Sequence, residues 1–365
     1  MNTSINKQWW NSLTEAWKDD FLYNIAFLET PFEEYDYRLA LGMEKSTYEM
    51  YYDKVYQKPK TYDLNQVLER LGTIKQFIIT EEQINDLEPL KALKQLTILE
   101  IFTGKVNLDK IGTLNQLQRL YITHNSMSLR ALKDLEKLNY LSLTHNISPL
   151  EPLEHLQMLK ELELSFETQD VSVVEDIKTL ENLFVYPADG DISLEQISGL
   201  KNIKELSIVN SFNEDLDFLS DMTNLKSLSI LFNTQDLTPI GKLKQLESLN
   251  IISNSQPLDV LLELKKLRKL NLTYNNVELD IVGQLTQLES LILNMNMQKL
   301  KPICSLTNLK YLKGQHTGYK LPCIEQLVNT INKNGGDAKI FDPIYEDETG
   351  DLIFYENFDE KIENV

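Results

Sequence analysis

Two histidines occupy the same place in neighbouring segments of the chain, in Thr123-His124-Asn125 and Thr144-His145-Asn146. If these segments are adjacent strands, the two rings lie about 4.8 Å apart, one strand separation. Imidazole nitrogens bind zinc-like metals, but such a site needs at least one further ligand. The corresponding position of the next segment holds Phe166. We therefore interpret the pair as surface histidines, expect no cofactor, and keep a metal-dependent enzyme centred on them as the less favoured alternative.

Other catalytic signatures are absent from the sequence. It contains no G-x-S-x-G, P-loop, H-E-x-x-H, C-x-x-C or dinucleotide-binding motif. Glu161 and Glu163 alternate along one predicted strand and so share a face. Without a predicted pocket around them, a solvated acidic patch is the simpler interpretation. The sequence favours a protein that is not an enzyme.

The net charge limits the kinds of partner that we expect, and the number of cysteines indicates the cellular compartment. The chain of 365 residues has 36 basic and 55 acidic side chains, a formal net charge of −19. This argues against nucleic acid or an anionic membrane, and leaves solubility or attraction of a basic protein as alternatives. Cys304 and Cys323 are too few for a disulfide framework, so we interpret them as small apolar residues in a reducing compartment. No stretch resembles a signal peptide or a membrane span, so we expect a cytoplasmic protein.

The dominant feature of the sequence is an internal repeat of the form L-x-x-L-x-x-L-x-L. Successive copies begin 21 to 23 residues apart. Alternating apolar residues such as Leu120 and Ile122 predict a short strand with one buried face. One repeat cannot bury this face alone, so the repeats must stack with parallel strands. The twelve copies begin at Leu71, Leu93, Leu114, Leu135, Leu156, Ile177, Leu200, Met222, Leu243, Leu264, Leu285 and Leu306.

Many repeats place asparagine three residues after the second strand leucine. An amide both donates and accepts hydrogen bonds. We therefore expect it to bond the backbone N–H and C=O groups after the strand, which have no partner in the sheet. The pattern L-x-x-L-x-L-x-x-N resembles leucine-rich repeats, and return segments such as Leu87-Glu88-Pro89-Leu90 resemble the short repeats of bacterial internalins. The resemblance covers residues 64–318 and implies binding of protein partners and a bacterial source. The asparagines of this pattern are Asn125, Asn146, Asn233, Asn254, Asn275 and Asn296.

The predicted fold is therefore an α/β leucine-rich-repeat solenoid. A curved parallel sheet would line its concave face, and turns or short 3-10 segments its convex face. We expect a helical N-terminal cap over residues 1–60, the repeat array over 61–320, and an acidic C-terminal cap over 321–365. The C-terminal cap should contain a helix from Pro322 to Asn332, a strand from Ala338 to Phe341 and a hairpin leading into Leu352–Tyr355.

The N-terminal cap is predicted from aromatic residues at helical spacing. Asp19 and Asp20 fall on the side opposite to that aromatic face, and a tyrosine-rich stretch from Lys45 to Tyr56 predicts a second helix. A stacked array exposes leucines at its end and needs a cap, although a docking element is an alternative for these aromatics. The aromatic face consists of Trp9, Leu13, Trp17 and Phe21.

The candidate binding site is an apolar run on the predicted concave face. Residues there flank the buried strand leucines, so the sheet cannot bury them, and an exposed apolar cluster is typical of an interaction site. The favoured function is a non-enzymatic scaffold that binds a partner protein. An immunity-type inhibitor that neutralises a basic toxin or enzyme is the alternative. The candidate partner-binding residues are Phe184, Tyr186, Val209, Leu231, Phe232, Ile252 and Tyr274.

Overall fold

The structure is a computed structural model of the chain. It describes residues 4–27, 62–80, 82–104, 106–124, 127–166, 170–187, 194–209, 215–232, 235–294, 298–315, 321–341, 344–346 and 352–354. The chain divides into two compact units, which we describe separately. The first unit comprises Met1–Leu180 with Tyr186–Ile192, and the second comprises Glu181–Val185 with Ser193–Val365.

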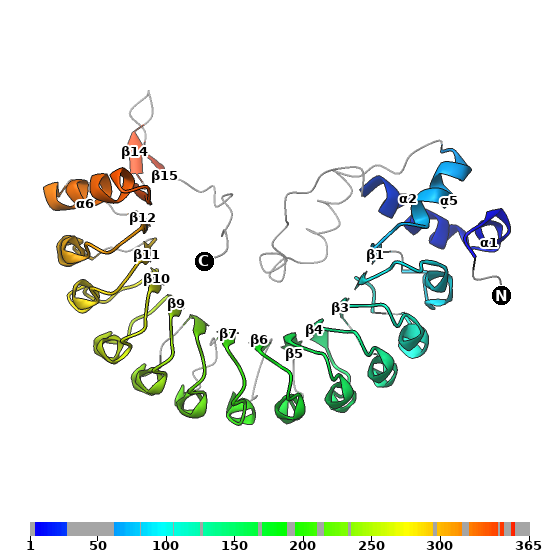
Figure 1. The fold of residues 1–365 in the computed structure, drawn as a ribbon, viewed down its shortest axis with the longest axis horizontal. Coiled ribbons are helices and arrows are strands. Elements are labelled where there is room, and N and C mark those ends of the chain that lie inside the picture. The colour runs from blue at the N-terminus through cyan, green and yellow to red at the C-terminus, as the bar shows by residue number, and fades with distance from the viewer. Residues whose placement is uncertain are drawn as a thin grey trace. The chain divides into compact units, whose positions relative to one another are not determined.

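Each repeat forms a strand followed by a short 3-10 helix. In the first unit the strands lie on one side and the 3-10 helices on the other (Figure 1). We call the strand surface turned away from the 3-10 helices the open face. The elements are β1 (Gln76–Ile79), β2 (Ile98–Ile101), β3 (Arg119–Thr123), β4 (Tyr140–Asn146) and β5 (Glu161–Phe166), with η1 (Glu88–Ala92), η2 (Leu108–Thr113), η3 (Arg130–Asp134), η4 (Glu151–His155) and η5 (Ser172–Asp176).

The second unit repeats this arrangement (Figure 1). Strand β6 (Asn182–Pro187) belongs to it up to Val185. Among the described residues, strands β1 to β12 and a later strand, β13, are parallel and ordered as in the sequence. The other elements are β7 (Glu205–Val209), β8 (Ser227–Leu231), β9 (Ser248–Ile252), β10 (Lys269–Thr273), β11 (Ser290–Leu293) and β12 (Tyr311–Gln315), with η6 (Leu194–Ile197), η7 (Asp217–Asp221), η8 (Thr238–Lys242), η9 (Asp259–Glu263), η10 (Val282–Gln284) and η11 (Lys301–Ser305).

The repeat leucines form the core. Leu228 pairs in register with Leu249 on the next strand, and both are 1% exposed. Register without offset places equivalent leucines directly above one another, so each repeat buries the apolar face of its neighbour. The return prolines, among them Pro89 and Pro239, lie in the first turn of their 3-10 helices. Proline fits there because its fixed φ suits the helix. Backbone N–H groups in the first turn of a helix have no acceptor within it, so the N–H that proline lacks is not needed.

The asparagines at the bends have the predicted structural role where the structure describes them. Asn146 donates from Nδ2 to the backbone oxygen of Ser148 at 2.8 Å, and Asn254 makes the equivalent bond to Gln256 at 2.8 Å. Asn275 does the same to Val277 at 2.7 Å. All three are buried, so their amides replace water as partners of the bend backbone. Asn125, Asn233 and Asn296 lie outside the described residues.

The N-terminal aromatic face is carried by two helices instead of one. Helix α1 (Lys7–Asn11) ends at Ser12, and α2 (Glu15–Phe27) begins after Thr14, whose Oγ1 accepts a hydrogen bond from the N–H of Trp17 at 3.3 Å. Trp9, Trp17 and Phe21 are buried, and the Phe21 ring lies 5.0 Å from that of Phe77 on β1. The predicted helix from Lys45 to Tyr56 lies outside the described residues.

The side chains of α2 also complete the free edge of β1. Asn24 donates to the backbone oxygen of Ile78 at 2.8 Å and accepts from its N–H at 2.7 Å. Asp20 is 1% exposed and accepts from the hydroxyl and the N–H of Thr80 at 3.0 and 3.2 Å. We placed Asp20 opposite the aromatic face and did not predict this contact, because the spacing of the aromatic residues carries no information about the edge of the sheet.

One helix was missed by the sequence analysis. Helix α5 (Leu64–Leu71) begins at Asp63, whose side chain accepts from the N–H of Asn65 at 2.8 Å. Leu71 ends this helix and is fully buried. Because Leu71, Ile74 and Phe77 have the spacing of a repeat, the sequence alone does not distinguish this helix from a 3-10 segment.

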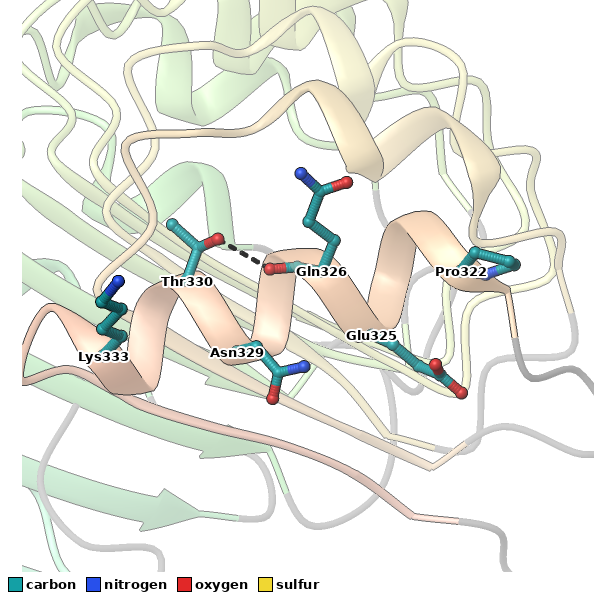
Figure 2. Close-up of a pocket in the computed structure, with 6 residues that line it drawn as sticks. All are labelled: Pro322, Glu325, Gln326, Asn329, Thr330 and Lys333. Carbon is teal, nitrogen blue, oxygen red and sulfur yellow. Dashed lines mark hydrogen bonds between the residues drawn. The ribbon is translucent and has the colours of Figure 1, made fainter.

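The C-terminal region contains the predicted helix, strand and hairpin. Helix α6 (Pro322–Lys333) precedes β13 (Asp337–Phe341), which pairs with β12 as a further parallel strand. The outward surface of α6 is polar along its length (Figure 2). Strands β14 (Ile344–Glu346) and β15 (Leu352–Phe354) form an antiparallel pair. The boundaries of caps and array themselves stay predictions.

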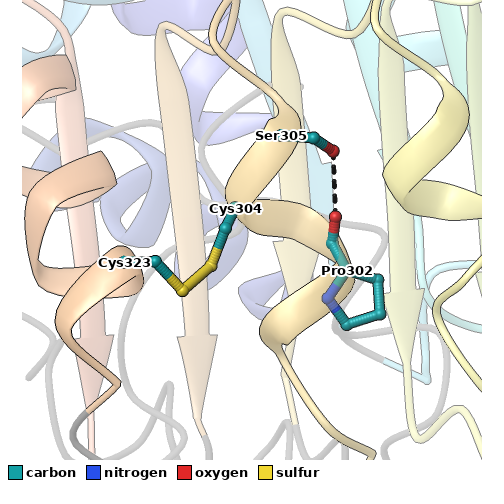
Figure 3. Close-up of a disulfide and its surroundings, with 4 residues drawn as sticks. All are labelled: Pro302, Cys304, Ser305 and Cys323. Atoms are coloured by element: carbon teal, nitrogen blue, oxygen red, sulfur yellow. Dashed lines mark hydrogen bonds between the residues drawn. A yellow bond between two sulfur atoms is a disulfide. The ribbon is translucent and has the colours of Figure 1, made fainter.

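The two cysteines form a disulfide, which corrects our interpretation of them as unpaired apolar residues. Cys304 on η11 and Cys323 on α6 are bonded, with Cα atoms 5.7 Å apart (Figure 3). The capping helix packs against the last repeat, and this contact brings together residues that are 19 positions apart in the sequence. Disulfides persist in oxidising compartments, so the cysteines no longer support a reducing one.

Candidate functional site

The second unit has an apolar row across the open face of three adjacent strands. Val209 on β7 pairs in register with Leu231 on β8, which pairs with Ile252 on β9. All three are the last residues of their strands and are half-buried. The strand leucines on the opposite face, which pack toward the 3-10 helices, are fully buried. The sequence analysis identified these three residues as candidates, and the structure brings them together.

Phe232 and Tyr274 follow directly on β8 and β10 and are exposed aromatic residues of the second unit. Their side chains are 52% and 43% exposed. Both have left-handed backbone, with φ of 61° and 54°, as has Ser253 at the equivalent position between them. In this conformation the N–H of Phe232 donates to the oxygen of Ile252 at 2.8 Å, and that of Tyr274 to Asn294 at 3.0 Å. This backbone hydrogen bond links each repeat to the next, and the side chain of the bend residue is exposed outside the core.

Beside the apolar row runs a row of uncharged polar residues. Asn250 donates from Nδ2 to the hydroxyl of Ser229 at 2.9 Å, and Asn271 accepts from the hydroxyl of Thr273 at 2.8 Å. The Oδ1 atom of Asn250 is buried and accepts no hydrogen bond from the described residues. The register places five uncharged residues in this row, on β7 to β11: Ser207, Ser229, Asn250, Asn271 and Ile292.

The two remaining candidates lie on β6 and are half-buried. Phe184 pairs in register with Ser207 and so belongs to the second unit's open face, whereas Tyr186 falls in the first unit. Both already interact with other parts of the chain. We therefore base the candidate surface on Val209, Leu231, Phe232, Ile252 and Tyr274.

The first unit's open face carries a charged and aromatic network instead. The Arg119 guanidinium lies 4.2 Å from the ring centroid of Tyr140 and donates from Nη2 to the hydroxyl of Tyr121 at 2.8 Å. Tyr140 in turn donates to Glu163 Oε2 at 2.6 Å. Burial, followed by the neighbouring Glu163 carboxylate, raises the pKa of Tyr140 far above its ordinary value, so its hydroxyl stays protonated.

Glu163 is 4% exposed, so the expectation of a solvated acidic patch was wrong for this residue. A buried carboxylate is tolerated when hydrogen-bond donors compensate for lost water, and the Tyr140 hydroxyl is such a donor. The sequence carried a signal for this cluster, since Tyr140 and Glu163 occupy neighbouring repeats. The alternation of Glu161 and Glu163 along one strand does not reveal this contact, because Tyr140 lies on the neighbouring strand.

The two histidines stack as the repeat spacing predicts. The rings of His124 and His145 lie 4.6 Å apart at an angle of 10°, and both side chains are exposed. Both residues have positive φ, so they occupy the same bend position as Phe232 and Tyr274 in the second unit. Within the described part of the chain, no three metal-binding side chains gather around them or elsewhere.

Two depressions are formed by described residues. The larger depression, about 380 Å³, lies on α6 and is formed by exposed residues of that one helix, as Figure 2 shows. A smaller one of about 70 Å³ lies between η1 and η2. None of the described helices is long and apolar enough to span a membrane.

Comparison with known proteins identifies the fold. No family model and no curated protein matches the chain. Among solved structures, an internalin (InlF) from Listeria monocytogenes has 22% sequence identity and a TM-score of 0.50, and the match covers 75% of this chain and 88% of the internalin. The mouse RP105/MD-1 complex has 17% identity and a TM-score of 0.53, over 74% of this chain and 51% of the other. With its parallel strands and 3-10 helices, the chain has the leucine-rich-repeat fold that internalins share.

Proposed function

We propose that the protein is a non-enzymatic scaffold that binds a partner protein on the open face of its second unit, which the sequence predicts to be concave. The observation that carries this proposal is the apolar surface of Val209, Leu231, Phe232, Ile252 and Tyr274, which includes two exposed aromatic rings. Aromatic side chains are favoured anchors at protein interfaces, because they bury a large area for little loss of conformational freedom.

The fold itself supports a binding role. One solved structure of the same fold, that of mouse RP105, is a complex with MD-1. Fold likeness carries no residue-level information, so the surface on this chain is proposed from its own side chains. The resemblance of the repeats to internalin repeats is also the basis for proposing a bacterial source.

A second candidate is an inhibitor that neutralises a basic toxin or enzyme. The net charge of −19 favours it, because a strongly acidic protein attracts basic partners over long range. The candidate surface itself, however, combines apolar with uncharged polar residues. The two candidates differ in their response to salt: association driven by overall charge weakens steeply with ionic strength, whereas an apolar interface does not.

The metal-dependent alternative would centre on the stacked pair of His124 and His145. A catalytic zinc site uses three protein ligands, and no third ligand accompanies the pair among the described residues. Elemental analysis of the purified protein for bound zinc tests this alternative directly. We propose no reaction for the chain.

The sequence predicts a cytoplasmic location. The disulfide removes one argument for it, because the cysteines were interpreted as unpaired residues of a reducing compartment. A Cys304–Cys323 bond present in the cell favours an oxidising compartment instead. Labelling free thiols immediately after lysis measures the redox state of the pair and so separates the two locations.

The binding proposal is tested by substituting the centre of the candidate surface. Leu231→Asp places a charge in the apolar row, and should abolish capture of the partner from the native source while leaving the melting temperature nearly unchanged. Met158→Asp is the matched control, because Met158 is also an exposed apolar residue, at 53%, but lies on a turn of the first unit. Equal capture by wild type and Leu231→Asp would contradict the proposal.

A further inference from the structure

Phe232 and Tyr274 stand where glycine would be the favoured residue. Their φ angles of 61° and 54° are in the left-handed region, which costs free energy for any residue with a Cβ atom and is rare for bulky side chains. The bend itself needs only the N–H, which bonds the next repeat, and Ser253 serves at the same position. The aromatic side chains are therefore not required by the fold, and their exposure leaves them available for contact.

The spacing of the two backbone positions indicates the shape of the ligand. Phe232 follows β8 and Tyr274 follows β10, so their backbone positions are two strands, or roughly 9–10 Å, apart. A polyproline II segment has three residues per turn and rises about 3.1 Å per residue, so residues i and i+3 lie on one side about 9 Å apart. A β-strand places residues i and i+3 on opposite faces. A helix could match with residues i and i+7, about 10.5 Å apart.

The polar residues beside the rings distinguish these last two shapes. Asn250 and Asn271 offer amide groups on β9 and β10. A helix already satisfies its own backbone, so such a row would find few partners along it. A polyproline II backbone makes no internal hydrogen bonds, and its carbonyl oxygens can accept from amides and hydroxyls. The row is uncharged from Ser207 to Ile292, and Lys313 continues it only on β12, beyond both aromatic residues, which favours an uncharged segment at the aromatics.

We propose that the second unit's open face binds an uncharged, proline-rich segment of the partner protein in the polyproline II conformation. Phe232 and Tyr274 contact prolines at positions i and i+3, while Asn250 and Asn271 donate to carbonyl oxygens of the segment. This proposal rests on the proposed function and adds to it the chemistry of the partner.

The test uses fluorescently labelled decaproline and the full-length protein, with binding followed by fluorescence anisotropy. We expect saturable binding that changes little between low and high salt. Phe232→Gly and Tyr274→Gly should each weaken it about ten-fold, because each removes one aromatic contact. Glycine suits the left-handed backbone, so these variants should fold as well as the wild type.

Two matched controls make the same backbone change without removing a proposed anchor. Ser253→Gly lies between the two aromatics, and His145→Gly lies at the equivalent bend of the first unit. Both should bind decaproline within about two-fold of the wild type. An equal loss in the controls and the aromatic variants would overturn the assignment of Phe232 and Tyr274 as anchors.

Further probes separate this proposal from its competitors. An uncharged helical peptide of alanine, leucine and glutamine, and cellohexaose as an uncharged glycan, should not bind. Absence of decaproline binding at ~1 mM, or preferential binding of either competitor, would overturn the proposal. If the native partner is still captured and this capture is lost in Leu231→Asp, the proposed function stands and only the polyproline II ligand is rejected.

Discussion

The open face of the first unit carries a charged and aromatic network, whereas the second unit carries exposed aromatic rings beside a row of uncharged residues. Tyr140 joins Arg119 and Glu163 into one network, and Glu163 is buried by it. In the second unit, Phe232 and Tyr274 extend from the sheet, and the row beside them is uncharged. Both faces are built on the same repeat. The leucines therefore determine the fold, and the residues between them determine whether a face forms an internal network or exposes apolar side chains.

The core is what the two units share, and its disruption should have the largest effect. Leu141→Ala in the first unit and Leu228→Ala in the second remove fully buried side chains and should each cost about 2–5 kcal/mol. Leu231→Ala, on the same strand as Leu228 but on the open face, should cost less than ~1 kcal/mol. Urea unfolding followed by circular dichroism measures all three. A similar cost for Leu231 and Leu228 would show that the second unit's open face is part of its core.

The ends of the two units are closed by different means, and this predicts the next largest effect. The first unit completes the edge of β1 with hydrogen bonds from Asp20 and Asn24, and the second binds α6 covalently to η11. Reduction of the Cys304–Cys323 bond should lower the free energy of unfolding by about 3 kcal/mol, since it releases a loop of this length in the unfolded chain. Unfolding with and without reductant measures the loss. The double variant Cys304→Ser/Cys323→Ser controls for effects of the reductant, to which it should not respond.

Polar substitutions on the two open faces should differ in cost. Tyr140→Phe removes the donor to Oε2 of a buried carboxylate and should cost about 1–3 kcal/mol. Ser229→Ala removes the acceptor of Asn250 on the half-exposed second face, where water can replace it, and should cost about 0.5 kcal/mol. Thermal unfolding of both variants gives the comparison. Equal costs would mean that the first unit's network does not contribute more to stability than the second unit's polar row.

The bend position should give the smallest effect in either unit. Ser253→Gly and His145→Gly relieve a left-handed residue but make the unfolded chain more flexible; these two effects oppose each other, so the free energy of unfolding should change by less than ~0.5 kcal/mol. Differential scanning calorimetry resolves such a change. A loss of several kcal/mol in either variant would show that the side chain, and not only the backbone N–H, holds the bend.

The repeat was predictable from the sequence, because each leucine obeys a local spacing that stacking imposes. Leu120 and Ile122 identify their strand without any knowledge of distant residues, and the amide chemistry of Asn254 identifies its bend. The stacked histidines followed from the same periodicity. Of the candidate surface, the three residues of the apolar row were found for this reason, as neighbours in a column of the repeat.

The features that depend on contacts between different elements were not predictable. Asp20 is buried because α2 lies against the edge of β1, and the pairing of Cys304 with Cys323 depends on where α6 packs. Neither contact leaves a periodic trace in the sequence. The left-handed conformation of Phe232 and Tyr274 was also missed, because glycine, its usual signal, is absent from these positions.

The amide of Asn24 has a consequence for how molecules of this protein associate. It offers β1 one donor and one acceptor, as the peptide group of an adjoining strand would. An uncovered strand edge is a template on which another polypeptide can add, and a repeating protein with such an edge risks head-to-tail growth into filaments. Asn24 and Asp20, supplied by one helix, occupy backbone groups that an added strand would need at this edge.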